Sequence, residues 1–270
     1  MPGKAAAGTR LIGRQSGLGP GPGVQMKCAA RLVSGVSGNH GQDSWKDALG
    51  ITGDDRVFVL ECRERHLSRN RPGPAMWDER YREKEFAYGR EPNDFLRGMV
   101  DCLPVGKTLC LAEGEGRNAV FLARMGHHVT AVDLSIVGLE KANRLAVEHQ
   151  VGIQTIHSDL AHYRIAPESW NAIVSIFAHL PPPLRQRVHR EVVAGLRPGG
   201  VFLLEAYTPD QLNYRTGGPP VEEMMMTLES LEEELRGLEW LHAQEVIRDV
   251  QEGEFHHGSG AVVQMIGRKV

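Results

Sequence analysis

The stretch "LCLAEGEGRN", residues 109–118, is an apolar run that ends in two glycines, each preceded by a glutamate. An apolar run of this length before glycines is typical of a buried strand that turns sharply into a helix. Glycine adopts positive φ values and leaves room for a ligand beside the backbone, because it has no Cβ. The stretch therefore predicts a strand, a tight turn and a helix, with a ligand site at the turn.

Strands and helices alternate around this stretch. The pattern predicts strands at 108–112, 128–132, 153–157, 172–177 and 201–205, and helices at 117–125, 135–149 and 184–196. A helix near 227–237 and strands at 239–249 and 261–268 follow, and two short helices precede at 76–89 and 92–103. This alternation predicts an α/β domain with a doubly wound, mostly parallel sheet that carries helices on both faces.

The first 75 residues differ from the rest of the chain. Residues 1–42 are rich in glycine and contain Lys and Arg but no Asp or Glu, so we expect a disordered extension. A transit peptide remains an alternative for such a basic segment. Residues 43–75 contain a possible short strand, "DRVFVLECRE", and a charged linker. We therefore predict a low-complexity extension and linker at 1–75 and one folded domain at 76–270.

Composition excludes several classes of function. The formal net charge is −3 at pH 7, which gives no general attraction to nucleic acid or to an anionic membrane surface. No apolar stretch approaches the roughly 20 residues of a membrane-spanning helix. The four cysteines form no CxxC pair and the histidines show no metal-ligand spacing, so no metal is expected. We predict a soluble, cytoplasmic protein without a nucleic-acid or membrane partner.

A carboxylate follows the second predicted strand at the spacing of a nucleoside site. Asp133 lies about twenty residues after Gly114, where a carboxylate accepts hydrogen bonds from ribose hydroxyls in doubly wound sheets. The alternative is that Gly114 and Gly116 serve only a tight turn and that Asp133 only caps a helix. The combination of turn, carboxylate and strand–helix–strand context favours an adenosine-containing ligand.

The charge at the turn discriminates between such ligands. A dinucleotide carries a pyrophosphate, which Glu113 and Glu115 would repel, whereas S-adenosylmethionine carries an ammonium and a sulfonium that they attract. The sequence therefore predicts S-adenosylmethionine as the cofactor. An NAD(P)-dependent oxidoreductase and a non-catalytic protein that binds S-adenosylmethionine remain the alternative functions.

Three later segments supply further candidate residues. Asp159 follows the third strand, where it and its neighbours would contact the adenine, or it is only a turn residue. His179 follows the fourth strand and would position or deprotonate the methyl acceptor, or serve the structure alone. Arg215 lies in the long segment 206–220, a candidate lid, and would hold an anionic acceptor or remain solvated.

An aromatic stripe on the first predicted helix faces two interpretations. Trp77, Tyr81 and Tyr88 would form a wall beside the sulfonium through cation–π contact, or pack this helix onto the core. Arg185, Arg187 and Arg190 are expected on a solvated helix face. The predicted cofactor-binding residues are Glu113, Gly114, Glu115, Gly116, Asn118, Asp133, Leu134, Ser158, Asp159, Leu160, Phe177 and Tyr88, and the predicted catalytic residues are His179 and Arg215.

The segments "WDERYREKEFAYGREPNDFL" (77–96), "LAEGEGRNAVFLARMGHHVTAVDLSIVGLEKANRLA" (111–146) and "TGGPP" (216–220) resemble class I S-adenosylmethionine-dependent methyltransferases, in particular the tellurite-resistance methyltransferase-like group. The resemblance covers roughly residues 76–270. It implies a seven-stranded sheet with one antiparallel strand, a lead-in helix that helps to close the cofactor site, and methyl transfer to a small acceptor. By resemblance alone, that acceptor would be a chalcogen oxyanion such as tellurite or selenite, or a thiol.

Overall fold

The computed structural model describes residues 73–83 and 85–270 of the 270-residue chain. The predictions for residues 1–72 lie outside the described residues, and the domain boundary at 75/76 stays a prediction. Within the described part, the expected alternation of strands and helices is present from α4 (Pro74–Tyr81) to the last strand, β7 (His256–Lys269).

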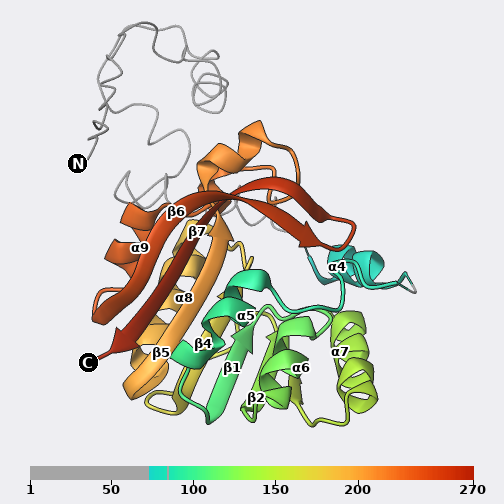
Figure 1. Ribbon diagram of the computed structural model, residues 1–270, viewed down its shortest axis with the longest axis horizontal. Helices are drawn as coiled ribbons and strands as arrows, with labels where there is room; N and C mark the ends of the chain where they lie inside the picture. The colour runs from blue at the N-terminus through green and yellow to red at the C-terminus, as the bar shows by residue number, and fades with distance from the viewer. Residues whose placement is uncertain (1–72, 84) are drawn as a thin grey trace, which may run out of the picture. The chain divides into compact units, whose positions relative to one another are not determined.

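One sheet forms the centre of the described domain (Figure 1). Its seven strands lie in the order β3-β2-β1-β4-β5-β7-β6. The other strands are β1 (Lys107–Leu111), β2 (His128–Asp133), β3 (Gln154–His157), β4 (Trp170–Ile176), β5 (Leu196–Tyr207) and β6 (Leu238–Glu252). Neighbours from β3 to β5 pair in parallel, and β7 runs antiparallel to both β5 and β6. This arrangement confirms the predicted doubly wound, mostly parallel fold.

Helices cover both faces of the sheet. The first group is α5 (Asp94–Met99), α6 (Arg117–Arg124) and α7 (Ile136–Glu148), and the second is α8 (Pro182–Gly195) and α9 (Leu228–Glu234). Side chains alternate between these layers along β1, since Leu109 and Leu111 join the core beneath α8 and α9 while Cys110 joins the core beneath α5 and α6. Alternation with a period of two is what a strand buried on both faces requires.

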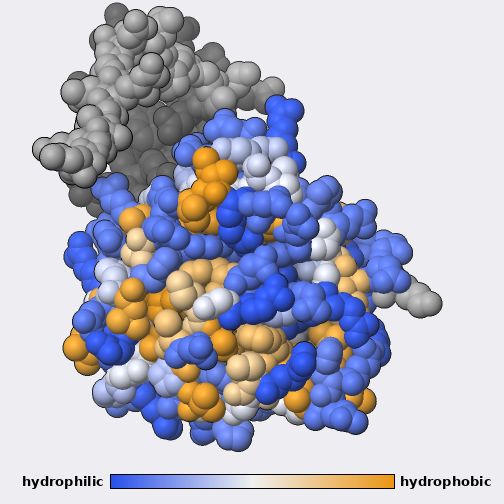
Figure 2. Space-filling view, viewed as in Figure 1, coloured by the Kyte–Doolittle hydropathy of each residue, from blue (hydrophilic) through white to orange (hydrophobic). Residues whose placement is uncertain are grey.

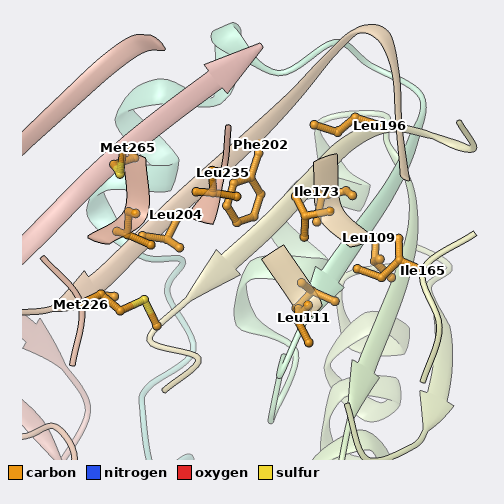
Figure 3. Close-up of a cluster of buried hydrophobic side chains, with 14 of the residues drawn as sticks. Leu109, Leu111, Ile165, Ile173, Leu196, Phe202, Leu204, Met226, Leu235 and Met265 are labelled. Atoms are coloured by element: carbon orange, nitrogen blue, oxygen red, sulfur yellow. The ribbon is translucent and has the colours of Figure 1, made fainter. Parts of the chain in front are cut away.

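The core beneath α8 and α9 collects side chains from distant parts of the chain. Figure 3 labels ten of them, which come from β1, β4, β5, β7, the C-cap of α9 and two loops. Phe202 and Leu196 are completely buried there. Burying such an apolar side chain contributes roughly 1.5–3 kcal/mol, so this cluster fixes the strand ends from which the site is built.

Caps set the starts of α5 and α7 close to the predicted ones, whereas the helix predicted at 76–89 is wrong in its second half, because α4 ends at Tyr81. The Ser135 hydroxyl accepts from the backbone N–H of Gly138 at 3.1 Å, and the Asn93 side chain accepts from the N–H of Leu96 at 2.9 Å. The last two strands are longer than predicted, because β6 and β7 pair with each other as far as Glu252 and His256. Pairing across a hairpin extends strands past their apolar residues, which a sequence pattern does not register.

The predicted solvated face of α8 needs a correction at Arg185. This side chain is buried, and its guanidinium donates to both carboxylate oxygens of Glu234 on α9 at 2.8 to 3.1 Å. His189 also contacts Glu234, at 2.7 Å. Arg187 is partly buried and pairs with Glu191, whereas Arg190 is exposed as expected. This face of α8 is polar because Arg185 and His189 pair with the buried carboxylate of Glu234 on α9.

The face seen in Figure 2 is mostly hydrophilic, with hydrophobic side chains gathered in separate patches. Large apolar side chains exposed on the surface include Leu241 and Ile247 of the outer strand β6. Among the described residues, no helix combines the length and apolar character needed to cross a membrane.

Candidate functional site

A cavity of about 610 Å³ lies at the carboxyl ends of β1 to β4. Its volume is in the usual range for small-molecule sites, and its position is where doubly wound sheets bind ligands. Its walls also include α4, the segment 217–221 and the turn between β6 and β7. Of the predicted site residues it brings together Glu113, Gly114, Glu115, Asn118, Asp133, Leu134, Asp159, Leu160, Phe177, Tyr88 and His179, whereas Gly116, Ser158 and Arg215 lie outside its lining.

The glycine turn has the left-handed backbone that its sequence predicts. Gly114 has a φ of 64°, and its N–H donates to the Oδ2 atom of Asp133 at 2.8 Å. A Cβ atom at Gly114 would lie 2.8 Å from the Tyr81 hydroxyl oxygen. The turn is therefore fixed by a hydrogen bond to Asp133, and Tyr81 of α4 packs against it.

Gly116 has a structural reason of its own. Its φ is 88°, and a Cβ atom there would lie 2.4 Å from the Cβ atom of Ala142 on α7. Only glycine permits this approach between the start of α6 and α7. The geometry gives Gly116 a packing role, and contact with the cofactor stays a prediction for it.

The two glutamates of the turn differ in their electrostatics. Glu115 is buried and forms an ion pair with Lys141 of α7, with 2.6 Å between the Nζ and Oε1 atoms. Its charge is compensated, so the expected pair of uncompensated carboxylates at the turn is corrected to one, Glu113. Burial raises the pKa of Glu113 to about 7, against hydrogen bonds from the N–H groups of Ala119 and Asn118 that lower it.

The strand-end carboxylates lie where the sequence predicts them. Asp133 accepts from the N–H groups of Gly114 and Ser135 at 2.8 and 2.7 Å, so it holds the turn as well as facing the cavity. Burial raises the pKa of Asp133 above its ordinary value, against the lowering by those hydrogen bonds. Asp159 accepts from the N–H of Ala161 at 2.7 Å, as a turn residue does, and it also lines the cavity with Leu160.

Two predicted contacts are engaged elsewhere. The Ser158 hydroxyl donates to the carbonyl of Asp159 at 3.3 Å and does not line the cavity. The Asn118 side chain accepts from the N–H of Asn93 at 2.9 Å, which ties the start of α6 to the segment before α5. Asn118 reaches the cavity while its carbonyl oxygen serves the fold.

The three aromatic side chains of the predicted stripe pack together although Tyr88 lies beyond the end of α4, and their contact with the sulfonium stays a prediction. Trp77 and Tyr81 stack with ring centroids 5.8 Å apart, and Tyr81 and Tyr88 meet edge to face at 6.3 Å. All three line the cavity, while the Tyr81 ring also packs over Gly114 and Gly138. The same rings therefore pack α4 onto the core and form one wall of the cavity.

His179 lines the cavity with both ring nitrogens near backbone groups. Its Nδ1 atom lies 3.2 Å from the carbonyl oxygen of Met224, and its Nε2 atom accepts from the N–H of Tyr207 at 3.4 Å. Burial lowers its pKa to about 4, against the raising effect of the Met224 hydrogen bond. A neutral ring fixed at both nitrogens is suited to positioning, so this geometry does not favour proton transfer by His179.

The predicted lid, segment 206–220, lines the cavity with its glycines and prolines and not with the side chain of Arg215. Arg215 is exposed and outside the cavity lining, while Gly217, Gly218, Pro219, Pro220 and Val221 line it. Gly217 and Gly218 have positive φ values, and Cβ atoms there would meet His256 and Tyr207 within 3.0 Å. The loop reaches the cavity through its glycines.

Sequence reasoning missed several cavity residues, among them Arg80, Arg117, Phe255 and His256. Arg80 stands within the quoted lead-in segment, between two residues of the aromatic stripe, and its position in that stripe was a usable signal. Phe255 lies in the turn between the last two strands and His256 begins β7, and the sequence offers no indication that this part of the hairpin folds back to the cavity.

A buried polar network lies beside the cavity and joins four elements. Arg248 of β6 donates to both carboxylate oxygens of Glu205 at 2.8 and 2.7 Å and to Glu252 at 3.0 Å. Arg117, which lines the cavity, pairs with Glu252, and Asn93 donates to both glutamates. Because charges are costly to bury unless they are paired, this network fixes the hairpin against α6.

Comparisons with known proteins agree with this architecture. Residues 109–200 match the family model described as a methyltransferase domain. No curated protein matches the chain in sequence. A solved structure described under the conversion of a disulfide bond into a thioacetal group during echinomycin biosynthesis has a TM-score of 0.60 at 15% identity, covering 73% of this chain and 91% of the other.

Two further solved structures share the fold. TehB from Haemophilus influenzae has a TM-score of 0.54 at 20% identity, and the match covers 73% of this chain and 67% of the TehB chain. The N-methyltransferase NodS from Bradyrhizobium japonicum has a TM-score of 0.51 at 14% identity, with coverage of 65% and 92%. The match to the methyltransferase family model spans the glycine turn and both strand-end carboxylates, so the chain contains a methyltransferase domain, and S-adenosylmethionine is the cofactor of that domain.

Proposed function

We propose that the protein transfers the methyl group of S-adenosylmethionine to a small-molecule acceptor within the cavity at the carboxyl ends of β1 to β4. Glu113 carries this proposal. It is a cavity-lining carboxyl whose pKa is raised to about 7, chiefly by burial, and no ion pair engages it among the described residues. A carboxyl in this state gains free energy when a cation arrives, and the sulfonium and ammonium of the cofactor are cations.

The other residues of the turn fit the same cofactor. Gly114 leaves open the space that a Cβ would fill, and Asp133 presents a carboxylate at the end of β2, where ribose hydroxyls bind in this class of sheet. Asp159 and Leu160 offer a polar group and an apolar side chain for a base. Trp77 and Tyr81 supply aromatic faces, which attract a cation.

Methyl transfer asks for alignment and for exclusion of water. When bound, S-adenosylmethionine supplies the methyl carbon, to which an acceptor lone pair forms the new bond while the bonding pair returns to the sulfur. The chain's part is to hold the acceptor in line, and α4, segment 217–221 and the β6–β7 turn wall the cavity for that purpose.

The cavity histidines favour acceptors that need no deprotonation by the protein. Burial lowers the pKa of His179 to about 4 and that of His256 to about 3, so both are neutral and weakly basic near pH 7. We therefore infer a thiolate or a chalcogen oxyanion, which already carries an available lone pair. The sequence resemblance to the tellurite-resistance group and the fold shared with TehB support this class.

An NAD(P)-dependent oxidoreductase and a non-catalytic binding protein are the alternatives that the experiment addresses. Calorimetric titration should show binding of S-adenosylmethionine and no binding of NADH. Incubation with methyl-labelled S-adenosylmethionine should then label one acceptor class among selenite, tellurite, thiols and small amines. Binding of NADH alone would refute the proposal, and cofactor binding without labelling of any acceptor would favour the non-catalytic alternative. The predicted cytoplasmic location stays a prediction.

A further inference from the structure

The cavity contains one cation that no carboxylate of the described residues neutralises. Two arginines line it, Arg80 and Arg117, and Arg117 pairs with Glu252. Arg80 forms no ion pair within the described part of the chain. Every carboxylate of the lining lies at the ends of β1 to β3, whereas Arg80 extends from α4 toward the β6–β7 turn. The cavity thus has an acidic side and a cationic side.

The Arg80 guanidinium is held in place without being neutralised. Its Nη1 atom donates to the Tyr88 hydroxyl at 2.8 Å, and its Cζ atom lies 5.2 Å from the Trp77 ring centroid and 4.7 Å from that of Phe255. Aromatic rings orient a guanidinium and leave its charge intact. Because a guanidinium has five N–H donors and Tyr88 takes one, donors remain for an anionic partner.

A second unsatisfied polar group lies on the same side. His256 is 8% exposed, and its Nδ1 atom is buried without a hydrogen-bond partner among the described residues. Its ring lies against Tyr88 at 4.6 Å and Phe177 at 4.8 Å between centroids. Buried polar groups without partners are rare in folded proteins and mark places where a ligand completes the site.

The cavity that contains Arg80 and His256 is lined largely by apolar side chains. They include those of Met76, Trp77, Phe177, Leu180, Val221 and Met224. A small inorganic oxyanion would lose its hydration shell here with one guanidinium to replace it, which is costly. An organic molecule gains free energy by burying its apolar body against the same walls.

We propose that Arg80, assisted by His256, binds the anionic group of the methyl acceptor, and that this acceptor is a small organic anion with an apolar or aromatic body. The inference rests on the proposed methyl transfer and narrows it: an organic thiol that bears or becomes an anion is favoured over a free chalcogen oxyanion. Arg80 is then the specificity-determining cation of the cavity, the role that the sequence had assigned to Arg215.

The test measures binding, so it does not depend on knowing the natural acceptor. The full chain is saturated with S-adenosylhomocysteine and titrated calorimetrically with benzoate, with its neutral isostere benzamide, and with selenite. We expect benzoate to bind at least about tenfold more tightly than either of the others, since a hydrogen-bonded charge pair distinguishes the ligands by this much or more. Equal binding of benzoate and benzamide, or tighter binding of selenite, would overturn the proposal.

Variants assign the effect to the residues. Arg80→Met should weaken benzoate binding about tenfold or more, Arg80→Lys should retain part of it, and His256→Phe should weaken it while keeping a ring in place. Arg82→Met is the matched control, because Arg82 is exposed and lies outside the cavity lining. S-adenosylhomocysteine affinity should stay unchanged in the Arg80 variants.

The cofactor's own carboxylate is the competing partner for Arg80. If Arg80→Met weakens S-adenosylhomocysteine instead of benzoate, the cation belongs to the cofactor and this inference is overturned. If the unmodified chain binds neither S-adenosylmethionine nor S-adenosylhomocysteine, the proposed function itself fails. The two failures are therefore distinguishable within one set of titrations.

Discussion

Replacing Glu113 by Gln tests whether the cavity is electrostatically prepared for a cation. The substitution keeps the shape of the side chain and an oxygen that can accept from the N–H of Ala119, a bond of 2.7 Å in the unmodified protein. It removes only the ability to become negative. Glu232→Gln, in an exposed position of α9, removes the same charge at the surface and serves as the control.

The sign and size of the effect follow from the pKa of Glu113. Its pKa in the folded protein is about 7, against an ordinary value of 4.5, so the folded state holds this proton more strongly than the unfolded state. Glu113 therefore lowers the free energy of unfolding as the pH rises from about 4.5 through 7, and the loss is complete above that. At roughly 1.4 kcal/mol for each pKa unit, the loss amounts to at most about 3 kcal/mol.

The assay is urea unfolding of the cofactor-free protein from pH 5 to pH 8. Glu113→Gln should gain stability over the unmodified protein as the pH rises, by at most about 3 kcal/mol at pH 8. The affinity for S-adenosylmethionine should change in the opposite direction. The unmodified protein should bind the cofactor more tightly as the pH rises and Glu113 ionises, whereas the affinity of the Glu113→Gln variant should not rise. A stability difference that stays constant from pH 5 to pH 8, or equal cofactor affinity at pH 8, would refute the reasoning.

Three further substitutions test the supporting structure, each followed by thermal or urea unfolding. Gly116→Ala should abolish stable folding or cofactor binding, because the new Cβ would lie 2.4 Å from the Cβ atom of Ala142 at a φ of 88°, whereas Gly98→Ala in α5 meets nothing within 4 Å and should be tolerated. Arg248→Met should cost about 3–5 kcal/mol, since it leaves the buried Glu205 without its cation while Glu252 keeps its pair with Arg117; a loss below 1 kcal/mol would contradict this. Arg185→Met should destabilise by a similar amount through the buried glutamate of α9, an effect that a solvated arginine would not show.

The fold was predictable from local features of the sequence. In β1, Leu109 and Leu111 alternate with Cys110 between the two faces of the sheet. Gly114 and Gly116 form the turn that follows β1, and Ser135 caps α7. Each of these signals acts within a few residues, and burial on both faces of a parallel sheet strengthens them. The ends of β6 and β7 were not predictable in the same way, because pairing between the two strands sets them.

The candidate site was predictable only where its residues follow the strands directly. The lining residues Glu113, Asp133 and Asp159 lie at the ends of β1, β2 and β3, so the order of elements alone brings them together. The compensation of Glu115 depends on Lys141, which is 26 residues away on another helix. No spacing rule links the two, and the charge argument from the sequence was therefore too strong by one carboxylate.

The missed residues share a physical reason. The cationic side of the cavity is built from the lead-in helix α4 and the β6–β7 turn, segments more than 150 residues apart that meet only in the folded domain. Arg248 and Glu252 on β6 lock this turn to Glu205 of β5 and, through Asn93, to the lead-in segment. Arg117, which directly follows the glycine turn, joins this network through Glu252, whereas Gly114 is held by its own hydrogen bond to Asp133.

Gly114 is held by Asp133 and covered by Tyr81, and neither of these is replaced when Arg80 or His256 is changed. Changes at Arg80 or His256 alter the wall against which an acceptor would rest. A fold that keeps its cofactor contacts on strand ends and its acceptor contacts on peripheral segments can change substrates at little cost in stability. The acceptor of this protein should therefore be sought from the chemistry around Arg80, since the glycine turn carries information only about the cofactor.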